Sequence, residues 1–211
     1  MTATHGVKEC GMELDVLRRK LTAPFRIGAA ADLRGITVSV PLDLSGAIIG
    51  NIDLSGAIFS APVCFRGAQF RGLAWFKGCS FRADADFSKA LFESDCRFDA
   101  ATFHAAAVFS RAEMRGIGAF DTATFGAAAD FDKLQVSGNL SLESTQFAGP
   151  VSFQGTECCG GLWLDHAAFS NRADFSGVEV HGRTWLRDVR HADATGADRS
   201  MRGITSYGYR T

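Results

Sequence analysis

The chain has 211 residues, a formal net charge of −1 and 21% charged residues. This balance excludes a disordered chain and a strongly nucleic-acid-binding one, and is typical of one or two soluble domains. No apolar run approaches the roughly 18 residues needed to cross a bilayer. Residues 1–20 mix acids and bases where a secretory signal would be apolar. We therefore expect a cytoplasmic protein with no membrane contact.

The first predicted element is a short amphipathic helix within residues 1–26. Its apolar residues recur at spacings of four, three and four among charged ones: Cys10, Leu14, Leu17 and Leu21. This spacing places them on one face of a helix. The ends of repeat folds expose strand edges and apolar core, so we interpret residues 1–26 as an N-terminal cap. A membrane-surface helix and a partner-binding helix are the alternatives.

The sequence repeats over residues 27–191. From Phe65 onward a large apolar residue, here called the centre, recurs in alternating steps of five and six residues, usually with a small residue two positions earlier. Counting Phe59, 17 of the 18 Phe lie at centres. An eleven-residue period also occurs in coiled coils, but these apolar positions would scatter around a helix. In an extended chain they point to one side, which predicts very short strands joined by corners.

Four steps in a coil give a stacking period of 22 residues, and one column of centres is then Phe at every level: Phe65, Phe87, Phe109, Phe131, Phe153 and Phe175. The extra residue in every second step predicts one looser pair of opposite sides or corners. The first coils are less regular, because the centres from 44 to 59 are five residues apart. Roughly seven to eight coils would form a rod about 35 Å long.

The A-(D/N/x)-(L/F)-x-x pattern resembles the pentapeptide-repeat family, as in Ala31-Asp32-Leu33, Leu42-Asp43-Leu44-Ser45-Gly46 and Ile52-Asp53-Leu54-Ser55-Gly56. The resemblance covers about residues 27–191 and implies an all-β, right-handed quadrilateral β-helix. This chain departs from the plain pattern in its 22 rather than 20 residues per coil. Residues 192–211 lose the pattern, and we expect a C-terminal cap, a dimerisation segment or a flexible tail there.

The inward positions offer little for catalysis. They are nearly all apolar, so there is no interior in which an acid, base or nucleophile could be tuned. The histidines are dispersed, and no HExxH, GxSxG, phosphate-loop or dinucleotide motif is present. Cys79, Cys96 and Cys158 fall on inward positions as core residues, whereas Cys64 and Cys159 should face outward. We expect no enzyme, no metal site and no cofactor.

The outward positions carry the candidate site. All three tryptophans, Trp75, Trp163 and Trp185, share one longitudinal row. Trp163 and Trp185 would lie one coil apart, about 4.8 Å, and could stack on each other. Two positions later, on the same side, four acids follow one another coil by coil: Asp99, Asp121, Glu143 and Asp165.

Each feature of this side has two interpretations. The Trp row is either a ladder that stabilises a sheet or an exposed patch for a partner or a second copy. The acids form either a solvated face, with some mutual repulsion, or an imitation of nucleic-acid phosphates. The latter follows from the resemblance, because some family members bind and protect DNA gyrase.

We therefore predict a non-enzymatic protein that presents rigid faces to a protein partner, with the three tryptophans and four acids as its partner-binding residues. The alternative is DNA mimicry that modulates or protects DNA gyrase or topoisomerase, which the net charge of −1 weakens. A homodimer through the Trp row is also open. Direct nucleic-acid binding is not expected, because the basic residues are balanced by acids.

Overall fold

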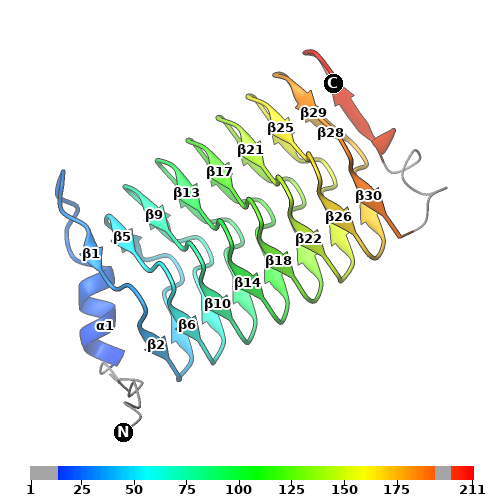
Figure 1. Cartoon of the computed structure of the whole chain (residues 1–211). Coiled ribbons are helices and arrows are strands. Elements are labelled where there is room, and N and C mark those ends of the chain that lie inside the picture. The colour runs from blue at the N-terminus through cyan, green and yellow to red at the C-terminus, as the bar shows by residue number, and fades with distance from the viewer. Residues whose placement is uncertain (1–13, 193–200) are drawn as a thin grey trace, which may run out of the picture.

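The structure, a computed structural model, describes residues 14–192 and 201–211 (Figure 1). In this part of the chain one helix, α1 (Leu14–Leu21), precedes 31 strands that are nearly all two residues long. The strands stack coil upon coil into four sheets, which form the sides of a rod. The predicted fold class, an all-β, right-handed quadrilateral β-helix with a short N-terminal helix, is confirmed.

Each sheet takes one strand from every coil, and neighbouring strands are parallel. The first sheet contains β1 (Ala31–Asp32), β5 (Ile52–Asp53), β9 (Ala74–Trp75), β13 (Cys96–Arg97), β17 (Gly118–Ala119), β21 (Leu140–Ser141), β25 (Leu162–Trp163) and β29 (Thr184–Trp185). The second contains β2 (Thr37–Val38), β6 (Ile58–Phe59), β10 (Ser80–Phe81), β14 (Thr102–Phe103), β18 (Thr124–Phe125), β22 (Gln146–Phe147), β26 (Ala168–Phe169) and β30 (Arg190–His191). The third contains β3 (Leu42–Asp43), β7 (Val63–Cys64), β11 (Ala85–Asp86), β15 (Ala107–Val108), β19 (Ala129–Asp130), β23 (Val151–Ser152) and β27 (Ala173–Asp174). The fourth contains β4 (Ile48–Ile49), β8 (Gln69–Phe70), β12 (Leu91–Phe92), β16 (Glu113–Met114), β20 (Gln135–Val136), β24 (Glu157–Cys158), β28 (Val178–Val180) and β31 (Ile204–Ser206).

The four corners of a coil are of two alternating kinds. One opposite pair consists of tight turns, as where the Ala57 amide donates to the Leu54 carbonyl at 2.9 Å and Gly56 has φ 70°. A positive φ at this place defines a type II turn and favours glycine. The other pair consists of open bends, which hold the additional residue. The prediction of one looser pair of opposite corners is therefore confirmed.

The register follows the length of these bends. Ile52 pairs with Ala74, 22 residues away, and later coils keep this offset. Ala31 pairs with Ile52, only 21 residues away. The bend between β4 and β5 holds two residues, and the next bend on that corner holds three. The irregular spacing at the start of the repeat thus arises because the bend between β4 and β5 has one residue fewer than the later bends on that corner.

Stacked phenylalanine rings fill the interior. In the all-Phe column successive rings lie nearly parallel, with centroids 4.9 Å apart for Phe87 and Phe109 and 5.1 Å for Phe109 and Phe131. Rings from adjacent sides meet edge to face, as Phe98 and Phe109 do at 5.3 Å. Each such pair contributes about 0.5–1.5 kcal/mol beyond its buried area. The same 22-residue period therefore sets both the strand ladders and the core.

The two ends of the rod are closed differently (Figure 1). Leu17 and Leu21 of α1 are buried in the core, and the predicted helix position Cys10 lies outside the described residues. At the other end β31 pairs with β28, and Thr184 bridges to Arg210, so residues 204–211 add part of a further coil. The division into residues 1–26, 27–191 and 192–211 stays a prediction.

Candidate partner-binding face

The three tryptophans lie on the outward side of the first sheet, as the sequence predicts. We call this side, together with the tight turns that follow its strands, the Trp face. Trp163 pairs directly with Trp185 across β25 and β29. Trp75 lies four coils from Trp163, about 19 Å at ordinary strand spacing. The residues between them in the row are Arg97, Ala119 and Ser141.

Trp163 and Trp185 meet edge to face rather than stacking in parallel. Their ring centroids are 5.0 Å apart and the rings are inclined at 74°. Both indoles lie over Gly161, where an added Cβ would come within 2.9 Å of Trp185 Cζ3 and 3.2 Å of Trp163 Nε1. The expectation of stacking is corrected. Gly161 has no side chain, so both indoles can lie over the bend. In the edge-to-face arrangement the positive edge of one ring meets the negative face of the other, which is favourable.

Two residues that the sequence pattern does not single out complete this end of the face. The Arg183 guanidinium carbon lies 5.3 Å from the Trp185 ring centre and 6.0 Å from the Tyr209 ring centre. These distances are typical of cation–π contacts. Tyr209 is 79% exposed. We call Trp163, Trp185, Arg183 and Tyr209 the aromatic–arginine cluster.

The four predicted acids do not form an unbroken row of free carboxylates. Asp99 is paired with Arg97, whose Nη2 lies 2.9 Å from its Oδ1. Asp121 accepts hydrogen bonds from the Ser141 hydroxyl and from the Glu143 amide. Asp165 accepts from the Arg187 amide at 2.9 Å. Among the four, only Glu143 is exposed and the other three are half-buried, so the expected repulsion is moderated by partners within the coil and in the next one.

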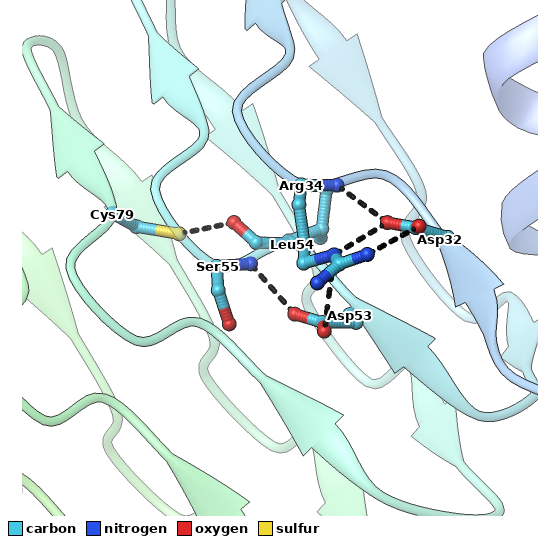
Figure 2. A network of polar contacts seen from close by, with 6 residues as sticks. All are labelled: Asp32, Arg34, Asp53, Leu54, Ser55 and Cys79. Carbon is cyan, nitrogen blue, oxygen red and sulfur yellow. Dashed lines mark hydrogen bonds and ion pairs between the residues drawn. The ribbon is translucent and has the colours of Figure 1, made fainter.

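The N-terminal end of the Trp face is also neutralised locally, as Figure 2 shows. Arg34 donates to both carboxylate oxygens of Asp32, at 2.9 and 2.8 Å, and lies 3.8 Å from Asp53 Oδ2. These hydrogen bonds lower the pKa of Asp32 to about 2. The Ser55 amide donates to Asp53 at 3.0 Å, and the buried Cys79 thiol donates to the Leu54 carbonyl at 3.0 Å.

Charge along the Trp face is therefore nearly balanced. Its acids are Asp32, Asp53, Asp99, Asp121, Glu143, Asp165 and Asp188, and its bases are Arg34, Lys77, Arg97, Arg187 and, in the aromatic–arginine cluster, Arg183. Seven acids minus five bases leave a surplus of two negative charges over eight strands. Double-stranded DNA of about 35 Å carries about 20 charges, one per about 1.7 Å.

No three His, Cys, Asp or Glu side chains within residues 14–192 and 201–211 are arranged to hold a metal ion. In the same part of the chain, no helix is long and apolar enough to cross a membrane.

The match to a family model concerns the middle of the chain. Residues 54–102 and 65–113 match a family model of pentapeptide repeats in nine copies. The search of curated proteins gives no match. Among solved structures the chain is similar to QnrB1, described as a plasmid-mediated fluoroquinolone resistance protein. That similarity has 17% identity and a TM-score of 0.28, and covers 83% of this chain and 87% of that one.

Proposed function

We propose that the chain is a pentapeptide-repeat protein, as the match over residues 54–113 supports, and that it acts as a non-enzymatic scaffold whose Trp face binds a protein partner. The solenoid supplies a long, rigid surface rather than a cavity. The partner is a protein that buries the aromatic–arginine cluster. The same surface on a second copy would produce a homodimer, which sedimentation of the purified chain distinguishes.

The observation that carries the proposal is the composition and placement of the aromatic–arginine cluster. Trp, Tyr and Arg are the residues that most often dominate the binding energy of protein interfaces. Here two indoles, one guanidinium and one phenol meet within neighbouring coils. Trp163 and Trp185 are held by paired strands and by their contact with each other. Trp163 and Trp185 would therefore lose little side-chain entropy when a partner binds them.

Catalysis has less support from the same residues. Burial raises the pKa values of Cys79 and Cys158 to about 12, so neither thiol is a ready nucleophile. The described acids of the Trp face accept hydrogen bonds or ion pairs from the scaffold itself, Glu143 excepted. These groups are therefore engaged with partners in their own coil or in the next one.

DNA mimicry directed at gyrase stays a prediction, and the charge of the Trp face does not favour it. A surplus of two charges is about a tenth of what DNA of the same length carries. A supercoiling assay with gyrase, with and without a quinolone poison, tests it directly. Protection at micromolar protein would favour mimicry, and no effect would count against it.

The proposed function is tested by replacing both clustered tryptophans, Trp163→Ser and Trp185→Ser, and measuring partner capture and self-association. Truncating an interface hot spot costs about 2 kcal/mol or more, so we expect capture to fall at least tenfold. The matched control is Tyr207→Ser, which removes a 63% exposed aromatic side chain from beside the fourth sheet. Unchanged capture and self-association in the double variant, with its circular dichroism preserved, would overturn the proposal.

A further inference from the structure

We propose that a groove at the N-terminal end of the rod binds a small organic anion with an apolar body. The groove has a volume of about 360 Å³ and lies between residues 25–30 and the first bends that lead into the first sheet. It contains Trp75 but no member of the aromatic–arginine cluster. The proposal is therefore independent of the function assigned to that cluster.

The wall formed by residues 25–30 is built as a small hairpin. Arg26 and Ala29 form an antiparallel bridge, and Gly28 between them has φ 77°, which favours glycine. The Asn51 amide group donates to the Arg26 carbonyl at 3.1 Å and to the Ala29 carbonyl at 3.2 Å. Asn51 Oδ1 accepts from the Leu73 amide at 2.9 Å. One side chain thus ties the hairpin to the opposite wall, and the groove is preformed.

The lining of the groove is apolar and unusually exposed. Ile27 is 93% exposed, Phe25 42% and Leu73 39%. The Trp75 indole also lines the groove. Isolated apolar residues on a surface need no explanation, but several converging on one concave site favour an apolar ligand. At about 360 Å³ the volume is near the lower end for small-molecule sites, so it fits a compact ring system better than a macromolecule.

The positive charge of Arg71 in the groove favours an anionic ligand. Arg71 lines the groove, and no carboxylate in the described residues lies within ion-pair distance of it. The nearby Asp32 and Asp53 are both engaged by Arg34. Lys77 lies over the Trp75 ring, with its ammonium 5.6 Å from the ring centre. A ligand that places its rings among the apolar side chains could therefore offer a carboxylate or sulfonate to Arg71.

The test uses two probes of the same shape that differ in charge. Anilinonaphthalene sulfonate has an apolar ring system and one anionic group, and phenylnaphthylamine has the rings without the anion. Isothermal titration calorimetry of the full chain should show one saturable site, with the sulfonate binding more tightly. Arg71→Met should weaken the sulfonate about five- to tenfold and leave the neutral probe unchanged. Ile27→Asp should weaken both probes, and the sulfonate more strongly, because the new carboxylate also repels an anion.

Matched controls keep the outcome interpretable. Arg82→Met removes an exposed arginine in the bend after β10, on the opposite corner, and Ile117→Asp changes a 42% exposed apolar residue outside the groove. Neither should alter probe binding, and neither should Trp163→Ser with Trp185→Ser. Absence of saturable binding up to about 1 mM probe would overturn the proposal. Saturable binding that neither Arg71→Met nor Ile27→Asp weakens would also overturn it.

Discussion

Burial separates the described cysteines into two chemical classes. Desolvation raises the pKa values of Cys79 and Cys158 to about 12 and raises that of Cys96 as well. All three lie in the core, whereas Cys64 is half-buried and Cys159 is exposed. The outward and inward placement that the period predicts is confirmed for all five. Their reactivity should follow, because only the thiolate is nucleophilic.

We therefore predict that a disulfide reagent such as dithiobisnitrobenzoate modifies Cys159 fastest in the native chain, and Cys64 more slowly. The three core cysteines should react only after unfolding in guanidinium, since the reagent cannot reach them and their thiols stay protonated. Mass spectrometry of quenched samples assigns the modified residue. If Cys96 were labelled in the native chain as fast as Cys159, its burial in the core would be contradicted.

His191 ends a column of phenylalanines, with its ring centre 4.9 Å from that of Phe169. Burial lowers the pKa of His191 from its ordinary value, so the unfolded state takes up a proton at higher pH than the folded one. The free energy of unfolding should thus decrease as pH falls below about 6.5.

His191→Phe should remove this pH dependence and extend the ring stack. We expect its melting temperature to exceed that of the unchanged chain by about 2–4 °C at pH near 5.5, and by less at pH near 8. Differential scanning calorimetry at the two pH values measures the difference. If the difference in melting temperature were the same at both pH values, the protonation of His191 would not contribute to the pH dependence of stability.

At the scale of the elements, glycine serves two separate purposes. In the tight turns it adopts a positive φ in open space: Gly67 has φ 65° and no atom within 4 Å of an added Cβ. In the bends it allows close approach of successive coils: an added Cβ at Gly160 would lie 2.3 Å from the Gly138 carbonyl oxygen. Lys89 and Arg111 occupy the tight-turn position with φ 58° and 57°, so that position tolerates a side chain.

The two purposes predict different costs for the same substitution. Gly67→Ala should lower the free energy of unfolding by about 1–2 kcal/mol, the backbone cost of a left-handed residue. Gly160→Ala should cost more, because two coils must separate or their ladder must distort. Urea unfolding monitored by circular dichroism measures both. Equal losses would contradict the distinction between turns and bends.

At the scale of the whole molecule, the period of the sequence predicts the coil, the sheets and the columns because a strand alternates its side chains strictly between two faces. It does not predict Tyr209 beside Arg183, since these residues are 26 apart, as are the paired residues of β28 and β31, whereas coil neighbours in the regular part of the repeat are 22 apart. The hairpin of residues 25–30 likewise precedes the regular pattern. The edge-to-face indoles depend on Gly161, whose role is visible only once the coils are stacked.

The three tryptophans share one row in the sequence, but in the rod they belong to two separate places. Trp75 shares its row with Trp163 and Trp185, but three coils without tryptophan lie between them. Their environments differ accordingly: Trp75 lines an apolar groove near Arg71, and the other two form a cluster with Arg183. One face of a solenoid can thus carry two sites, because every coil is rigidly placed by its neighbours.

Photo-crosslinking from each side of the rod in turn can show whether the Trp face is the partner-binding side. Benzoylphenylalanine is placed singly at four exposed positions of neighbouring coils, one for each side: Glu143, Gln146, Gln154 and Gln135. We predict a discrete adduct with a partner protein from Glu143 on the Trp face, lost when Trp163→Ser and Trp185→Ser are added. Adducts of equal yield from all four sides, or from another side alone, would show that the Trp face is not the partner-binding side.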